Sequence, residues 1–151
     1  MTRNQGFQKW IDGTKAWLEL QEWDTFATLT YRNSLSVPSA RRAMERFLQL
    51  ADVELAWWVT ERGDKFGRVH NHALIRHHGT GLLLFDDPTL PADRAEAQWR
   101  ARYGIARYDR YDPDRGAAGY CASYVTKKVC DYDLWLPSTS SPIKPSPLRN
   151  D

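Results

Sequence analysis

Residues 55–61 read LAWWVTE and residues 69–75 read VHNHALI, and these two stretches decide the fold. Apolar runs of this length, rich in β-branched and aromatic residues, are typical of buried strands. The intervening GDKFG at residues 63–67 has a glycine at each end, which indicates a turn. The two stretches therefore predict an antiparallel hairpin.

Further strands and helices are predicted on both sides of this hairpin. The order is strand, helix, the two hairpin strands, helix, strand and helix, which predicts an α+β fold with a central antiparallel β-sheet and flanking helices. A short N-terminal helix, interrupted at residues 12–14, is also expected. The predicted strands are Thr25–Tyr31 and Ile105–Tyr111, and the predicted helices are Ser36–Leu50, Pro91–Tyr103 (ended by Gly104) and Ala117–Cys130.

Length and composition favour one soluble globular domain. The chain has 151 residues with 42% hydrophobic and 26% charged residues, which is ordinary for such a domain. The net charge of +2 is too small to indicate nucleic-acid binding by itself. From Arg100 to Lys128, however, seven Lys or Arg residues face three Asp residues. We expect a domain over residues 1–135 and a Pro/Ser-rich disordered tail over residues 136–151.

Cellular location is constrained by what the sequence lacks. No apolar run approaches the roughly 20 residues of a membrane span, and residues 1–5 lack the apolar core of a signal peptide. The two cysteines, Cys121 and Cys130, show no disulfide framework. These features predict an intracellular protein with no membrane partner.

Two histidines and a carboxylate form a candidate metal site. Residues two apart on a strand point to the same face, so His70 and His72 project together. Glu61 ends the preceding strand, and the hairpin brings it near His70 if the register is favourable. Two imidazoles and one carboxylate leave open positions for substrate oxygens. Imidazole binds several divalent metals, so the residues alone leave the metal open.

A second candidate cluster lies on the last predicted helix. Tyr120 and Tyr124 are four residues apart and share a helix face, and Lys127 lies one turn beyond Tyr124. A phenol ionises near pH 10, so a nearby cation or metal ion would be needed to make tyrosine nucleophilic. The alternative is that both tyrosines pack on the sheet while the lysines are solvated.

Together these features resemble the HUH endonuclease superfamily, in particular the rolling-circle replication initiators (Rep proteins) of small single-stranded DNA viruses and plasmids. The resemblance covers roughly Phe26 to Lys128. It rests on the order and spacing of an FTLTY-like strand, an acidic residue, the paired histidines and a two-tyrosine motif. These lie at Phe26–Tyr31, Thr60–Gly63, Gly67–Ile75 and Tyr120–Lys128.

The sequence departs from the family pattern at two positions. The residue between the histidines is usually hydrophobic in the family, whereas here it is Asn71. That position faces away from the metal in a strand, so the chemistry should survive. Two-tyrosine members often carry Lys three residues after each tyrosine, but Tyr120 is followed by Ser123. This favours Tyr124 as the principal nucleophile and leaves the role of Tyr120 open.

The resemblance implies a sequence-specific single-stranded DNA endonuclease and strand transferase of the HUH/RRM-like, ferredoxin-like sandwich type. Tyr124 would attack a phosphate and form a 5′-phosphotyrosine with a free 3′-OH, and Lys127 would orient the phosphate. His70, His72 and Glu61 would hold a divalent metal ion, Mn²⁺ or Mg²⁺. Arg107, Arg110 and Lys128 are the expected DNA contacts.

The same resemblance implies particular partners. The substrate would be a single-stranded origin, expected as a hairpin, and the 3′-OH would prime a host polymerase. No Walker A motif is present in the sequence, so a host helicase is expected to unwind the DNA. The expected location is the cytoplasm of a bacterial or archaeal host, with the protein encoded by a virus or plasmid.

Three alternatives stay open at this point. One is an HUH single-strand transposase or relaxase, although no third histidine matches the relaxase pattern. Another is a non-catalytic RRM-like module that stacks bases on Trp57, Trp58 and Tyr108. The third is a structural interaction domain in which the histidines and tyrosines only pack.

Overall fold

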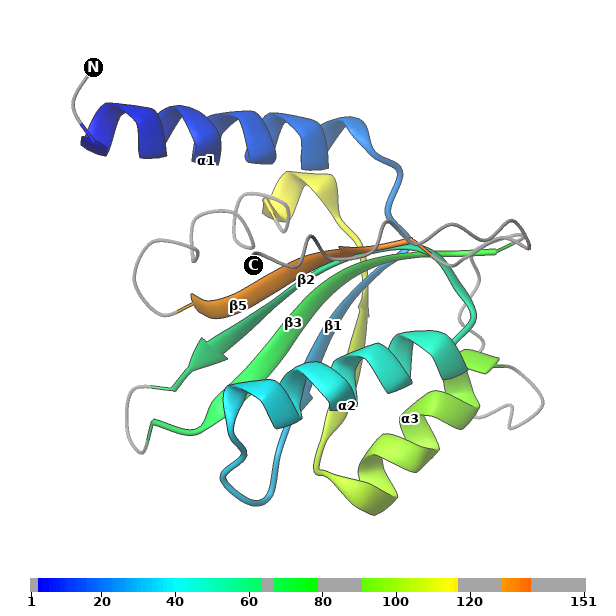
Figure 1. The fold of residues 1–151 in the computed structure, drawn as a ribbon. Coiled ribbons are helices and arrows are strands. Elements are labelled where there is room, and N and C mark those ends of the chain that lie inside the picture. The colour runs from blue at the N-terminus through cyan, green and yellow to red at the C-terminus, as the bar shows by residue number, and fades with distance from the viewer. Residues whose placement is uncertain (1–2, 64–66, 79–90, 117–128, 137–151) are drawn as a thin grey trace, which may run out of the picture.

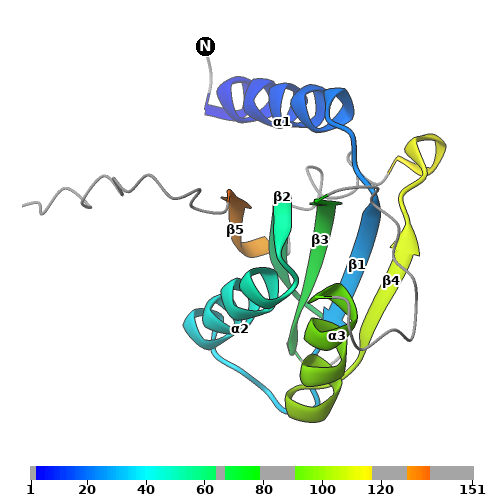
Figure 2. The ribbon, with the colours of Figure 1, turned by 90° about the vertical axis from the view of Figure 1, so that its right-hand side faces the viewer.

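A five-stranded antiparallel sheet forms the centre of the molecule in a computed structural model, which describes residues 3–63, 67–78, 91–116 and 129–136 (Figure 1). The strand order is β4-β1-β3-β2-β5, seen side by side in Figure 2. This confirms the predicted α+β class. The strands are β1 (Thr25–Thr30), β2 (Val53–Arg62), β3 (Val69–His77), β4 (Ala106–Arg110) and β5 (Val129–Trp135).

Helices lie on both faces of the sheet. The helices α2 (Val37–Leu50) and α3 (Pro91–Arg102) cover one face, and α1 (Arg3–Leu20) lies over the other (Figure 1). The α2 helix begins where the sequence predicts, because the Ser36 hydroxyl accepts a hydrogen bond from the Ser39 N–H at 3.2 Å. Beyond the end of α3, a Cβ on Gly104 would lie 2.5 Å from the Thr30 carbonyl oxygen, so glycine is required there.

Alternate residues of the strands build two separate apolar clusters. The larger cluster packs under α2 and α3 and includes Trp58, Ile75 and Tyr108. The smaller cluster lies on the α1 face and consists of the buried residues Leu18, Trp23, Leu55, Trp57, Val59 and Leu74. Because side chains alternate between the faces of a strand, β2 contributes Trp57 and Trp58 to different clusters.

The N-terminal helix differs from the prediction. It runs without interruption through residues 12–14, so the predicted break is wrong. Two side-chain contacts one helical turn apart support this stretch: Gln8 Nε2 donates to Asp12 Oδ1 at 2.9 Å, and the Thr14 hydroxyl donates to the Trp10 carbonyl at 2.8 Å. A glycine within a helix costs only about 1 kcal/mol relative to alanine, so Gly13 is tolerated.

The strand β5 was not predicted, and the predicted helix is wrong at its last two residues. Val129 and Cys130 belong to β5, which pairs with β2. Its sequence, VCDYDLW, alternates aspartate with apolar residues, which is a strand pattern. The rest of that predicted helix, residues 117–128, lies outside the described residues, as do residues 137–151 of the predicted tail.

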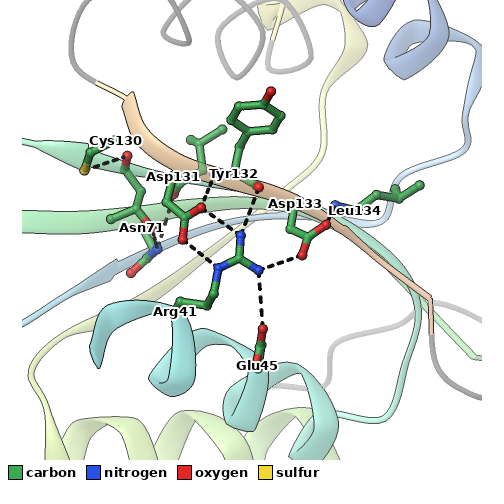
Figure 3. A network of polar contacts seen from close by, with 10 residues as sticks. Arg41, Glu45, Asn71, Cys130, Asp131, Tyr132, Asp133 and Leu134 are labelled. Atoms are coloured by element: carbon green, nitrogen blue, oxygen red, sulfur yellow. Dashed lines mark hydrogen bonds and ion pairs between the residues drawn. The ribbon is translucent and has the colours of Figure 1, made fainter. Parts of the chain in front are cut away.

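A single arginine on α2 ties β5 to the body of the protein (Figure 3). Nε and Nη2 of Arg41 donate to the two carboxylate oxygens of Asp131 at 2.8 and 2.7 Å, and Nη1 donates to Asp133 at 2.7 Å. The hydrogen bond to Asp131 is the main cause that raises the pKa of the Arg41 guanidinium. The Tyr132 ring points to the opposite side of β5. Both aspartates therefore face α2.

Among the helices that the structure describes, none combines the length and apolar character that a membrane crossing needs.

Candidate metal centre

The register of the sheet brings Glu61, His70 and His72 together. In the β2–β3 ladder, Glu61 lies directly opposite His70, and Val59 lies opposite His72. On the other side of β3, Thr28 of β1 lies opposite His72. The ladder is regular from Leu55 to Arg62, so the side chains of Glu61 and both histidines project from the same face, the face that α1 covers in part.

One carboxylate oxygen faces both imidazoles. Oε2 of Glu61 is 3.1 Å from Nε2 of His70 and 3.2 Å from Nε2 of His72. One ligand atom from each of the three residues can be chosen so that all lie within 4.8 Å of one another. Ligand atoms bound about 2.0–2.2 Å from a shared metal ion lie about 3–4 Å apart. The three side chains therefore fit a divalent cation without large rearrangement.

The carboxylate of Glu61 is buried and ionised. Its residue is 1% exposed. Burial raises the pKa of the carboxyl, but hydrogen bonds from His70 and His72 outweigh burial, so the pKa is about 2, below its ordinary 4.5. Among the residues that the structure describes, its second oxygen, Oε1, has no hydrogen-bond partner. A buried oxygen without a partner is costly, and a bound cation would satisfy it.

Two residues of β1 hold the ring of His72. The Thr28 hydroxyl lies 3.2 Å from Nδ1 of His72, and the Phe26 ring stacks on the imidazole at 5.4 Å with an interplanar angle of 11°. When Nδ1 donates its proton to Thr28, the lone pair on Nε2 is available to a metal ion. Sequence reasoning missed Thr28. The alternation of Phe26, Thr28 and Thr30 would have placed it on the histidine face, but only the β1–β3 register shows which histidine it meets.

Asn71 faces away from the metal centre. Its side-chain oxygen accepts a hydrogen bond from the Tyr31 hydroxyl at 2.6 Å, and its Nδ2 donates to the Thr60 hydroxyl at 2.7 Å. All three residues are buried. Burial raises the pKa of Tyr31 far above its ordinary value, so the phenol stays a neutral donor. The polar residue between the two histidines is therefore part of the core on the α2 face.

The remaining predicted site residues fall into two groups. Tyr120, Tyr124, Lys127 and Lys128 lie outside the described residues. Arg107 and Arg110 lie on β4, where Arg107 is opposite Thr28 and so shares a face with His72, whereas Arg110 alternates with Tyr108 on the other face. An ion pair joins Arg107 to Asp109 at 3.3 Å.

Two further observations bear on the alternatives and on the second cluster. Trp58 and Tyr108 are buried in the core, which leaves them no free face for stacking bases. Val129, the first residue of β5, lies opposite Glu61 in the β2–β5 ladder. The segment with the two tyrosines and two lysines thus joins the sheet beside a candidate metal ligand.

Comparison with known proteins gives one family match. The family model, described as a replication-associated protein of the ORF2 type, matches residues 24–129, which is more than half of the chain. No curated protein and no solved structure matches the sequence.

Proposed function

Because the chain belongs to this family of replication-associated proteins, we propose that it initiates rolling-circle replication by nicking and joining single-stranded DNA through tyrosine transesterification. The family membership supports a role in replication initiation. The nicking chemistry is our proposal, and it extends to a two-tyrosine HUH mechanism.

The observation that carries the proposal is the cluster of Glu61, His70 and His72. These side chains would hold a divalent ion, which when bound polarises a phosphate oxygen and offsets negative charge that develops during cleavage. Because Mg²⁺ prefers oxygen ligands while two of these three ligands are imidazoles, the donor set favours Mn²⁺ over Mg²⁺. Thr28 and Phe26 orient one of the imidazoles, which keeps the site preorganised.

Tyr124 is the proposed nucleophile. Its phenolate oxygen attacks the scissile phosphorus, the bond from phosphorus to the 3′ oxygen breaks, and that oxygen takes up a proton to give a free 3′-OH. Tyr124 precedes Val129 by five residues, and five residues span at most about 18 Å. Since Val129 lies opposite Glu61, this chain distance is compatible with attack at the metal centre. Lys127 would favour phenolate and orient the phosphate, and Tyr120 would serve as a second nucleophile.

Proposed DNA contacts come from the basic residues around the site. Arg107 has the strongest support because it shares the face of His72. Arg110 and Lys128 would contact the DNA backbone outside the metal centre. The single-stranded origin, expected as a hairpin, would be unwound by a host helicase, and a host polymerase would extend the 3′-OH in the host cytoplasm.

Cleavage of labelled single-stranded oligonucleotides tests this proposal. Purified protein is mixed with a pool of oligonucleotides in Mn²⁺ or in EDTA, and the products are separated on a denaturing gel. We expect cleavage in Mn²⁺ only, its loss in His72→Ala, and extension of the new end by a polymerase. DNA binding in EDTA without cleavage under any condition would instead support a non-catalytic binding module.

A further inference from the structure

A groove lined by aromatic rings lies between α1 and the sheet. Its volume is about 480 Å³. Seven uncharged residues from three elements line it: Trp10, Gly13, Thr14, Trp17, Trp57, Tyr132 and Leu134. The α1 residues recur at helical spacing, with the small residue Gly13 between two tryptophans. The groove therefore has the lining of a site for flat apolar groups.

The rings of the groove keep accessible surface. Trp10 and Trp17 are each 37% exposed, and Tyr132 is 43% exposed. Tyr132 contacts Trp10 and Trp57 with centroid distances of 5.5 and 5.6 Å. Rings held by one another yet open on one side can stack on a further flat ring, and nucleobases are the flat rings that such platforms take in single-stranded DNA.

The groove opens on the face of the sheet that carries the metal centre. Trp57 and Glu61 are four residues apart on β2, so both side chains project from the same face, about 13 Å apart along the strand. Tyr132 lies opposite Val59, which lies opposite His72, so these three residues form one row across the sheet. The groove and the metal centre are therefore neighbouring parts of one continuous surface.

The charges of β5 are directed away from this surface. Asp131 and Asp133, which flank Tyr132, are bound by Arg41 on the opposite face. The carboxylates of β5 therefore do not repel a polyanion that enters the groove. Because the family match begins at residue 24, α1 with its tryptophans lies outside the matched region. The groove is thus formed partly by a segment beyond the shared domain.

We propose that this aromatic groove is a base-stacking subsite for the single-stranded DNA substrate, next to the metal centre. The inference rests on the proposed function and deepens it. At about 3.4 Å per stacked base, 13 Å corresponds to about four nucleotides, and to fewer in an extended strand. The groove thus holds a base about two to four nucleotides from the scissile phosphate.

Equilibrium binding in EDTA tests the subsite separately from cleavage. Trp10→Ala and Trp17→Ala are compared with wild type by fluorescence anisotropy of a labelled single-stranded oligonucleotide. Base–aromatic stacking predicts a rise in Kd of about 5- to 100-fold for each variant. Leu20→Ala is the matched control, because Leu20 lies on the same helix, is 81% exposed and does not line the groove. It should stay within about twofold of wild type, and Trp10→Phe should recover most of the affinity.

Removal of single bases from the DNA locates the subsite. Oligonucleotides with one abasic position are bound to wild type and to Trp10→Ala. A position that weakens binding to wild type but not to Trp10→Ala marks the stacked base and supports the proposal. Tryptophan fluorescence is also measured with a synthetic peptide of residues 137–151. A Trp10-dependent change with the peptide and none with DNA would assign the groove to the chain's own Pro-rich segment and overturn the proposal.

The outcomes separate this inference from the proposed function. Wild-type cleavage in Mn²⁺ together with unchanged DNA affinity in both tryptophan variants would refute the subsite and leave the nicking activity intact. Tryptophan-dependent binding without cleavage would support the subsite and refute the nicking activity.

Discussion

Glu61 of β2 lies directly opposite His70 of β3, and its oxygen Oε2 is 3.1 Å from Nε2 of that histidine. The same oxygen is 3.2 Å from Nε2 of His72. The carboxylate is buried, so its charge acts on both imidazoles with little screening by solvent. One side chain on one strand therefore sets the electrostatics of the whole cluster.

Replacing Glu61 with glutamine should weaken metal binding without a large change of shape. The substitution keeps the volume of the side chain but removes the only negative charge among the three ligands. We expect the Kd for Mn²⁺ to rise at least about tenfold, equivalent to about 1.4 kcal/mol. The measurement is titration of Mn²⁺ followed by its electron paramagnetic resonance signal, which falls on binding.

Glu54→Gln is the control for this prediction. Glu54 lies on the same strand and is 3.3 Å from Arg76, away from the histidines. Its variant should bind Mn²⁺ as wild type does. Equal Mn²⁺ affinity in Glu61→Gln and wild type would show that Glu61 is not a ligand.

Thr28→Val should loosen the His72 ring and weaken the metal centre indirectly. Loss of an outer partner of a ligating histidine costs about 10- to 100-fold in metal affinity. Thr25→Val is the matched control, because Thr25 lies on the same strand and its hydroxyl is 3.3 Å from Nε2 of His77 instead. A similar change in Mn²⁺ affinity for both variants would argue against a specific role of Thr28.

Asn71→Ala should reduce stability while leaving metal affinity within about twofold of wild type. It removes the acceptor of the Tyr31 hydroxyl and the donor to Thr60, all buried on the face opposite the metal centre. We expect the free energy of unfolding to fall by about 2–4 kcal/mol, measured by urea denaturation. Tyr31→Phe should then cost less in the Asn71→Ala background than in wild type. Additive effects of the two substitutions would contradict a coupled network.

Arg41→Met should release β5 from α2. The variant keeps an apolar side chain beside Trp58 but leaves Asp131 and Asp133 without their cation. Because the guanidinium and Asp133 are partly exposed, we expect a loss of about 1–2 kcal/mol. Hydrogen exchange of the β5 amides should be faster. Arg42→Met, whose guanidinium contacts the Ser39 hydroxyl at 3.0 Å, should exchange as wild type does, and equal rates in both variants would exclude the tie.

The hairpin and its chemistry were the most predictable parts of the molecule. Alternation placed His70 and His72 on one face, and the short turn after β2 limited the possible registers. The observed pairing of Glu61 with His70 follows from a turn that starts at Gly63, whose N–H donates to the Arg68 carbonyl at 2.8 Å. Strands joined by a short turn carry their pairing in local sequence.

Long-range pairings were less predictable. The order β4-β1-β3-β2-β5 places β5 beside β2 although about 70 residues separate them, and no local pattern specifies that partner. The groove depends on α1 packing over the sheet, which sequence alone showed only as scattered tryptophans. Thr28 was missed for the same reason, because its importance arises from contact with a strand about 40 residues away.

The central claim is that a tyrosine of this chain forms a covalent bond to single-stranded DNA at the metal centre. The most direct measurement is a denaturing protein gel of wild type, Tyr124→Phe and Tyr120→Phe after incubation with labelled oligonucleotides in Mn²⁺ or EDTA. The account predicts a labelled band at the size of a protein–DNA adduct, formed only in Mn²⁺ and lost in Tyr124→Phe. Loss in Tyr120→Phe alone would reverse the assignment of the nucleophile, and absence of any adduct with DNA that wild type binds would contradict the account.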